Sequence, residues 1–594
     1  MIDDWRKLLS FFSAGEKRQI LLLLLSTTVS GLVQAVGVAS IMPFIAVVAD
    51  PDLVVENHYL SWAYGALGFT STNAFLKFLG LVAFGMLLAT NLLVGINAWL
   101  TFRVCHLGEY NLARRLMSRY LARPYLFLLQ RNSSELVKMA VTEIDRVAIG
   151  TLMAGINVFS DAVTTLFIVV LLVVIQPWVM TVTLVVLAVA YLLIYLLIMP
   201  KVTRLGAEFA TLNTEIYKNA HEAVGAAKAI KVLGREAHFV ERFSRPLLRS
   251  SRNAITYSTL DIVPAQSLEL VAFGGLVFAT VYLIGDTGDA GRILPVIAML
   301  AYAAYRLIPA LQGLFDGIEA IRYKTAALDA LWQDYSDPGT EPAIATGDAM
   351  VPRRSIRLEN ISFRYPDSRQ DTLSGLSLTI PAGRAVCLAG PTGAGKSTTV
   401  DLLLGLLPSS AGGITVDGTL VTPGNVRAWR DNIGYVPQVI YLIDDTIASN
   451  IALGMEPADI DYARLERAAR IAELHDFVVN ELAAGYQTVV GERGARLSGG
   501  QRQRIGIARA LYREPAVLIL DEATNELDLA TEARILDSLR ALGGRTIIFV
   551  SHKPSVATFC DEVVVLESGR IAAQGSYDEL TAPGSRHRAL LQET

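Results

Sequence analysis

The first half of the chain alternates long uncharged apolar stretches with basic segments. Three stretches, Gln19–Ala49, Phe78–Phe102 and Ala162–Pro200, contain no Asp, Glu, Lys or Arg. A helix that crosses a membrane needs about 20 residues, so the first two stretches each predict one spanning helix. The third predicts two, separated by a turn near Pro177, because proline disfavours a continuous helix.

Two shorter apolar stretches, Leu270–Gly285 and Ile293–Tyr305, follow a second basic segment. Each becomes long enough to span a membrane if one charged residue, Glu269 or Arg306, lies inside it. The run lengths argue against core helices of a soluble protein, and the first run is too long for a signal peptide. We therefore predict six spans, which cover about 19–49, 78–102, 150–176, 178–200, 262–285 and 292–314.

Lys and Arg are concentrated in two of the segments that connect these spans. Segments 103–146 and 201–252 are rich in both residues, whereas Asp50–Leu76 contains neither. Basic connections face the cytoplasm, so these two segments and the N-terminus are predicted to be cytoplasmic. Their apolar spacing is helical, which predicts that the spanning helices continue into the cytoplasm.

The second half of the chain has a different pattern. Residues 333–355 contain several Pro and Gly turns and are predicted to form a linker. From Ile356 onwards, short apolar runs that suit buried strands alternate with helical patterns. These runs are Ala385–Ala389, Val517–Leu520, Thr546–Val550 and Val563–Leu566. We therefore predict an all-α six-helix transmembrane domain over 1–332 and an α/β domain over 356–594.

Composition narrows the classes of function. Only 18% of the 594 residues are charged, which excludes a disordered chain. The formal net charge is −4, so no nucleic-acid partner is expected. The cysteines, Cys105, Cys387 and Cys560, are far apart in sequence and form neither a disulfide framework nor a metal-binding spacing.

A phosphate-binding loop follows the first of the predicted strands. The run Gly390-Pro391-Thr392-Gly393-Ala394-Gly395-Lys396-Ser397 fits G-x-x-x-x-G-K-[ST] and precedes a helical pattern that begins at Thr398. Its glycines let backbone N–H groups surround phosphate oxygens, and the helix N-terminus adds a favourable field. Lys396 is expected to reach the β- and γ-phosphates, and Ser397 to bind Mg²⁺.

Two carboxylates follow the buried strand Val517–Leu520. Asp521 suits the Mg²⁺ shell, and Glu522 suits the base that polarises or deprotonates the attacking water. The alternative is a strand that ends in two solvated acids. The phosphate-binding loop on the same chain argues against that alternative.

A second anion-binding helix N-terminus is predicted between these two motifs. Ser498, Gly499, Gly500 and Gln501 precede a helical pattern. One nucleotide does not need two such sites on one chain. Two chains that face each other would use both sites, one on each side of the γ-phosphate.

These motifs resemble, element by element, the ATPase cassette of ABC transporters. Tyr365 matches the aromatic residue that stacks on adenine, and Gln438 matches the glutamine that senses Mg²⁺ and the γ-phosphate. Asp528 matches the aspartate of the dimer-interface loop, and His552 matches the switch histidine. The resemblance implies ATP and Mg²⁺ as cofactors, with Glu522, His552 and Gln438 as catalytic residues.

Six spans followed by one cassette resemble an ABC exporter half-transporter (type IV fold), which implies a homodimer with two composite ATP sites. The turns Tyr125–Arg131 and Gly225–Phe239 correspond to the helices that press on the cassettes in this family. The chain departs from the family at Asn525-Glu526, where Ser-Ala is usual. This departure either alters coupling between the two sites or is a substitution without functional effect.

A narrower resemblance links the membrane half to the bacterial lipid-linked oligosaccharide flippases (PglK type). It is carried by Met42–Asp50, Glu56–Leu60 and Ala304–Pro309. It implies ATP-driven flipping of a lipid-linked glycan across the bacterial inner membrane. The alternative is an exporter of a peptide, a lipid or a hydrophobic small molecule. The spans exclude a soluble cassette protein, and an ATP-gated channel would pass substrate without stoichiometric ATP turnover.

Arg306 is expected at membrane depth, about 21 Å along the helix from Arg292. A charge at that depth is costly and usually functional. Arg306 either faces the translocation cavity and attracts an anionic head group of the substrate, or is neutralised by Glu269 of the preceding span. The cavity of the flippase family is basic at more than one position, whereas the apolar stretches here contain no second arginine.

Overall fold

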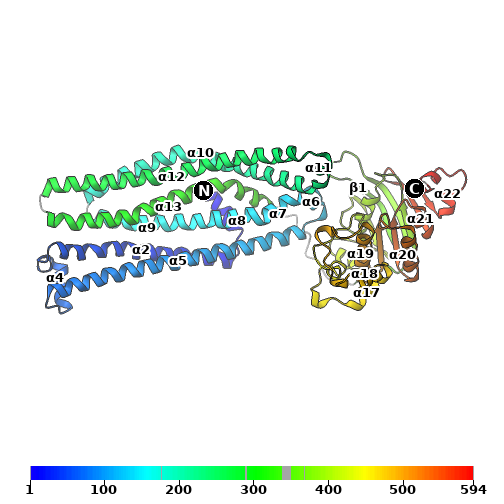
Figure 1. The fold of residues 1–594 in the computed structure, drawn as a ribbon, viewed down its shortest axis with the longest axis horizontal. Helices are drawn as coiled ribbons and strands as arrows, with labels where there is room; N and C mark the ends of the chain where they lie inside the picture. The colour runs from blue at the N-terminus through cyan, green and yellow to red at the C-terminus, as the bar shows by residue number, and fades with distance from the viewer. Residues whose placement is uncertain (1, 176, 288–289, 337–348, 367, 593–594) are drawn as a thin grey trace. The chain divides into compact units, whose positions relative to one another are not determined.

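The computed structural model describes residues 2–175, 177–287, 290–336, 349–366 and 368–592. The chain divides into two compact units, which are coloured by residue number in Figure 1. The first unit comprises Met1–Ala122 and Gln130–Pro338, and the second comprises Arg123–Leu129 and Gly339–Thr594.

The first unit is helical. Its elements are α1 (Ile2–Ser10), α2 (Ala14–Ala49), α3 (Leu53–Glu56), α4 (His58–Ala66), α5 (Thr72–Ala122), α7 (Ser133–Lys138), η1 (Met139–Glu143), α8 (Ile144–Val147), η2 (Ala148–Met153), α9 (Ala154–Ile175), α10 (Pro177–Gly225), α11 (Ala227–Leu233), α12 (Glu236–Thr287) and α13 (Ala290–Ser336). Within this unit α2 packs along α5 and α9, α9 packs along α13, and α10 packs along α12 (Figure 1).

Four helices in the described part of the chain are long and apolar enough to cross a membrane. They are Ala14–Ala49, Thr72–Ala122, Ser133–Val174 and Ala188–Gly225. The predicted fifth and sixth spans lie within α12 and α13, and they stay predictions because many of their side chains are not described. Gln176, the outer turn at 288–289 and linker residues 337–348 lie outside the described residues.

The spanning helices continue well past their apolar stretches, as the spacing of the basic segments predicts. Helix α5 runs on to Ala122, and α10 runs on to Gly225. One buried charge outside the apolar stretches is paired: Glu143 accepts from Lys138 Nζ at 3.1 Å and from Arg146 at 3.1 Å. These contacts compensate for the loss of hydration that burial imposes on each ion.

One short segment differs from the predicted boundary of the membrane domain. Residues Arg123–Leu129, which include most of α6 (Tyr125–Gln130), group with the second unit. The reason is apolar packing, because Leu126 lies against an apolar cluster built from strands of both sheets of that unit. The domain predicted over 1–332 therefore lacks this segment in the structure.

The second unit contains two sheets and is the predicted α/β domain. Its strands are β1 (Ser355–Phe363), β2 (Leu373–Pro381), β3 (Ala385–Ala389), β4 (Ala411–Val416), β5 (Thr419–Leu420), β6 (Ile433–Val436), β7 (Val517–Asp521), β8 (Thr546–Val550), β9 (Glu562–Glu567) and β10 (Arg570–Gly575). One sheet has the order β2-β1-β4-β5 and is antiparallel, and the other has the order β10-β9-β3-β8-β7-β6. In the second sheet the pairs β9–β3, β3–β8, β8–β7 and β7–β6 are parallel.

Helices connect these strands. They are α14 (Lys396–Leu403), α15 (Val426–Arg430), α16 (Ile447–Ile451), α17 (Tyr462–Ile471), α18 (His475–Glu481), α19 (Gly499–Tyr512), α20 (Leu529–Ala541), α21 (Pro554–Phe559), α22 (Tyr577–Thr581) and α23 (Arg588–Gln592), with short turns η3 (Pro457–Asp459), η4 (Gly485–Gln487) and η5 (Glu492–Gly494). The four runs predicted as strands from the sequence correspond to β3, β7, β8 and β9, which are neighbours in one sheet.

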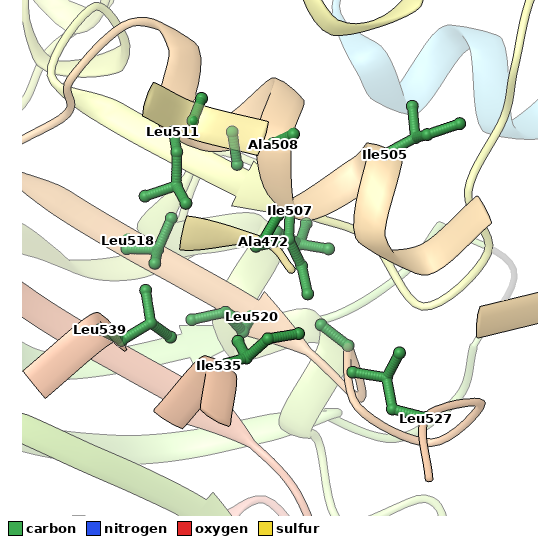
Figure 2. Packing of buried hydrophobic residues seen from close by; sticks show 14 of the residues in the cluster. Ala472, Ile505, Ile507, Ala508, Leu511, Leu518, Leu520, Leu527, Ile535 and Leu539 are labelled. Atoms are coloured by element: carbon green, nitrogen blue, oxygen red, sulfur yellow. The ribbon is translucent and has the colours of Figure 1, made fainter. Parts of the chain in front are cut away.

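Apolar packing fixes the position of β7 relative to the helices that carry the other motifs. Figure 2 shows Ile507 and Leu511 of α19, Leu518 and Leu520 of β7, and Ile535 of α20 in one buried cluster. Because α19 and α20 are held against β7 in this way, the residues that follow β7 lie beside the N-terminus of α19.

Trp429 tests how far the second unit depends on this kind of packing. Its side chain is fully buried in α15, and its Nε1–H donates to the Leu403 carbonyl at 2.7 Å. We expect Trp429→Ala to destabilise the second unit by about 3–5 kcal/mol, because it leaves a large cavity. Trp429→Phe should cost less, since it removes the hydrogen bond but keeps most of the packing.

The measurement is the thermal midpoint at which the purified chain loses ATP binding. Val439→Ala is the matched control, because Val439 is 81% exposed in the same unit. Equal midpoints for Trp429→Ala and Val439→Ala would contradict the expectation.

Candidate functional site

The predicted phosphate-binding loop joins β3 to α14. Gly395 caps the start of α14 with a φ of +100°, and a Cβ at this position would lie 2.6 Å from the Leu373 side chain. Both conditions require glycine. Lys396 Nζ donates to the carbonyl oxygens of Gly390 at 2.7 Å and Pro391 at 3.0 Å, so its ammonium group lies within the curve of the loop.

The carboxylates at the end of β7 lie within electrostatic range of this lysine. Burial lowers the pKa of Lys396, and Glu522 and Asp521 act in the opposite direction. Burial also raises the pKa of Asp521 to about 6, with a further increase from Glu522 and a decrease from Lys396. The structure therefore brings together the loop and the strand end that the two motifs predict.

The Glu522 side chain is held by two amides. Its Oε2 accepts from Gln438 Nε2 at 2.7 Å and from Asn525 Nδ2 at 3.0 Å. The sequence placed Gln438 and Glu522 in one site, and the structure brings these two side chains into contact. The contact from Asn525 was not predicted, because this residue was noted only as a departure from the family pattern.

The backbone of Glu522 is strained and firmly held. Its φ of +49° lies in the left-handed region, which is unfavourable for a residue with a side chain. Its N–H donates to the Val550 carbonyl at 2.9 Å, and its carbonyl accepts from Gln503 Nε2 at 3.2 Å. Gln503 is buried in α19, and its Oε1 also accepts from the N–H of Glu526 at 2.9 Å.

Gln503 was missed by the sequence analysis. The available signal was a polar residue on the buried face of the helical pattern, in register with Ile507. A buried amide that must satisfy its polar atoms is expected to bond to backbone groups of a neighbouring segment.

The donor set for Mg²⁺ consists of oxygen atoms. Ser397 offers a hydroxyl at the start of α14, Asp521 a carboxylate at the end of β7, and Gln438 an amide oxygen. Mg²⁺ prefers such ligands and usually keeps several waters and substrate phosphates in its shell. These residues therefore fit a magnesium ion that is bound together with nucleotide phosphates.

The predicted adenine-stacking residue lies beside the phosphate-binding loop. The Tyr365 hydroxyl is 3.3 Å from Thr398 Oγ1, and its ring packs edge-on against Phe363 at a centroid separation of 4.9 Å. The structure thus places Tyr365 beside the start of α14.

The second predicted anion site is the N-terminus of α19. Ser498 and Gln501 form a capping box: Ser498 N–H donates to Gln501 Oε1 at 2.8 Å, and Gln501 N–H donates to Ser498 Oγ at 3.3 Å. The carboxylate of Glu526 covers this terminus, because a Cβ added to Gly499 would overlap it. Arg502 also lies 3.6 Å from the same carboxylate.

Two predicted site residues are not brought into contact with the others. Asp528 caps α20, where its Oδ1 accepts from the Thr531 N–H at 3.0 Å, and this backbone hydrogen bond lowers the pKa of Asp528. His552 is exposed after β8 and forms no hydrogen bond within the described chain. The expected roles of Asp528 at a dimer interface and of His552 as the switch histidine stay predictions.

A polar cavity of about 420 Å³ lies among the apolar helices of the first unit. Arg306 lines it together with polar side chains from α2, α5 and α9, which include Gln34, Asn97, Asn157 and Asp161. Arg306 donates to Asn91 Oδ1 and to the Tyr302 hydroxyl, each at 3.4 Å. In the described structure it forms no ion pair with Glu269, and a contact of Arg306 with a substrate stays a prediction.

Comparisons with known proteins agree with this architecture. Residues 19–305 match the family model described as ABC transporter transmembrane region, and residues 373–525 match the one described as ABC transporter. The chain is 32% identical over 474 residues to the "ATP-dependent lipid A-core flippase" of Saccharophagus degradans, which covers 79% of each chain. It is 30% identical over 480 residues to the protein of the same name from Ralstonia nicotianae, again over 79% of each chain.

A solved structure is similar over almost the full length. The ATP-bound structure of a bacterial Atm1-family ABC exporter covers 98% of both chains with a TM-score of 0.78 and 25% sequence identity. The fold and the nucleotide site thus define an ATP-hydrolysing membrane transporter. The chain belongs to the ABC transporter family, and its membrane region followed by one cassette makes it an ABC exporter half-transporter.

The Glu522 side chain provides the direct test of the site. We expect Glu522→Gln to bind ATP but to hydrolyse it about 10²–10⁴-fold more slowly, because the amide cannot accept the proton of the attacking water. ATP binding and phosphate release by the purified protein measure the two effects separately. Glu514→Gln, at an exposed carboxylate of the same unit, is the control. Hydrolysis at the unmodified rate in Glu522→Gln would refute the assigned role.

Proposed function

We propose that the protein acts as a homodimer that uses ATP to flip a lipid-linked, glycan-bearing substrate across the bacterial inner membrane. The observation that carries this proposal is the polar cavity with Arg306 inside a bundle of apolar helices. The names of the similar proteins, lipid A-core flippases, support a substrate that combines acyl chains with a large polar head.

The cavity suits a polar head group. Its volume of about 420 Å³ lies within the range of small-molecule sites, and its lining mixes hydroxyl, amide and charged side chains. Arg306 would attract one anionic group of the substrate. Asp161 lies in the same lining, so the cavity offers acidic, basic and neutral polar groups to a head group.

This lining also bears on the alternative substrate classes. A hydrophobic small molecule would leave the buried polar groups of the cavity without partners, which is unfavourable. A glycan presents many hydroxyl groups that can donate to and accept from these side chains. The lipid-linked oligosaccharide remains one member of this class, and lipid A with its core sugars is another.

The ATP cycle follows from residues of the second unit. Lys396 and the backbone N–H groups of its loop would bind phosphates of one chain's nucleotide, and Ser498 of a second chain would complete the site. Glu522, oriented by Gln438 and Asn525, would take the proton of the attacking water. A magnesium ion bound at Ser397, Gln438 and Asp521 would neutralise charge on the phosphates.

The proposed topology follows from the distribution of basic residues. The N-terminus and the second unit lie in the cytoplasm, where ATP is available. The short helices α3 and α4 then lie on the outer side, with Tyr59 and Trp62 exposed towards the membrane interface.

Flipping in liposomes tests the proposal. The purified protein is reconstituted with a fluorescent lipid-linked oligosaccharide, fluorescent lipid A with its core sugars, or a fluorescent phospholipid without sugar. We expect ATP to move at least one of the two glycan-bearing lipids to the other leaflet, and Glu522→Gln to abolish this movement. Active ATPase without flipping of either glycan-bearing lipid would contradict the proposal.

Substitution of Arg306 tests recognition of the head group separately from ATP turnover. Arg306→Ala should reduce flipping at least tenfold while basal ATPase persists, because the cavity loses its cation. Arg306→Lys should retain part of the transport, since it keeps the charge. Glu269→Gln is the control in the preceding helix. If Arg306→Ala prevents assembly, or if it transports normally, Arg306 does not recognise the substrate.

A further inference from the structure

Glu319 of α13 is buried without any compensating partner. Its side chain is 0% exposed, and neither Oε1 nor Oε2 accepts a hydrogen bond. Nothing in the transport cycle described above uses this residue. It lies beyond the end of the predicted sixth span, on the cytoplasmic side of the cavity that Arg306 lines.

The surroundings of Glu319 are largely apolar. It lies one helical turn from both Phe315 and Tyr323, on the same face of α13. Phe315 and Tyr323 pack in a cluster with side chains of α10 and α12, which include Met199 and Tyr257. Glu319 therefore lies where three long helices meet.

The charged groups that face Glu319 have the same sign. Asp261 of α12 and Asp316 of α13 both interact with it electrostatically, and Tyr257 of α12 lies within the same range. Asp161 of α9 and Tyr191 of α10 are close enough to interact with Asp316.

Basic side chains of the neighbouring helices face other groups. Arg146 interacts with Tyr323, and it also interacts with Lys324, which in turn faces Asp145. Among the described residues, no lysine or arginine forms an ion pair with Glu319.

An ionised carboxylate in this buried position would have neither a hydrogen bond nor an opposite charge from the described residues. Such a group becomes neutral by taking up a proton rather than remaining charged. A metal ion is a weaker candidate, because the described residues contain no group of three or more His, Cys, Asp or Glu arranged to hold one.

The two aspartates provide a route to this carboxyl group. Asp316 is exposed, Asp261 is half-buried and Glu319 is fully buried, and the three carboxyl groups lie within electrostatic range of one another. We propose that Glu319, reached through Asp261 and Asp316, is a proton-binding site of the membrane unit, occupied in the packing of α10, α12 and α13 seen here.

Proton occupancy is then linked to conformation. A rearrangement that separates α10 and α12 from α13 would hydrate Glu319 and release its proton, and protonation would in turn favour the packed arrangement. The proposal does not depend on the identity of the transported substrate, because it concerns a site outside both the cavity and the ATPase.

Infrared difference spectroscopy of the reconstituted transporter tests this site. A protonated buried carboxyl group gives a C=O stretching band that a carboxylate lacks. We expect this band in the nucleotide-free protein, its loss or shift when ATP is trapped on the Glu522→Gln background, and its absence in Glu319→Gln. Glu269→Gln, at an exposed carboxyl group of α12, should leave the band unchanged.

Proton release provides the second readout. Glu522→Gln, which traps ATP, is the parent protein here. In weakly buffered solution, trapping ATP on this parent should release protons, and this release should be lost when Glu319→Gln is added. Glu319→Asp keeps a titratable group and should retain a shifted band, which covers the case in which Glu319→Gln does not assemble. A carboxyl band and a proton release in Glu319→Gln that match those of the parent, or an unshifted band in Glu319→Asp, would overturn the proposal.

Discussion

An ionisable side chain inside a bundle of apolar helices must be paired, solvated or neutralised, and this constraint organises the membrane unit. Glu143 is paired with Lys138 and Arg146 where the third spanning helix leaves its apolar stretch. Arg306 is solvated by a polar cavity and by Asn91 of another helix. Glu319 is neither paired nor solvated, so the remaining way to accommodate it is neutralisation by a proton. Few charged residues are present in these helices, so the surroundings of each one indicate how the bundle accommodates a charge at that position.

A different constraint organises the ATPase unit. The carboxyl ends of parallel strands lie at one edge of the sheet, and ligands of α/β sheets bind at that edge. Strands β3 and β7 end there, which brings the Lys396 loop beside Asp521 and Glu522. The left-handed backbone of Glu522 is held by Val550 and Gln503. The apolar cluster of α19, β7 and α20 therefore supports a conformation that the chain would not adopt by itself.

Much of this was predictable from the sequence, because the strongest signals are local. Run length indicated the spans, and the spacing around Lys396 and the strand before Asp521 indicated the ATP site. Contacts between segments that are far apart in the sequence were harder to predict from it. Gln503 reaches Glu522 only because of how α19 packs on β7, and Asn91 of α5 reaches Arg306 of α13 only in the folded bundle. Asn525 reaches Glu522 through the turn that follows β7, whose geometry the sequence did not reveal. The burial of Glu319 results from the packing of α10, α12 and α13, which the local sequence does not reveal. The grouping of Arg123–Leu129 with the second unit likewise depends on tertiary packing of Leu126.

The acidic residue at the N-terminus of α19 has a consequence for nucleotide affinity. The carboxylate of Glu526 lies where a side chain on Gly499 would be, and 3.6 Å from Arg502. A phosphate that arrives at this terminus is repelled by an anion that is already attached to the chain. The affinity of the terminus for phosphate is therefore lower with Glu526 than with a neutral residue at this position, and salt, which screens these charges, reduces that difference.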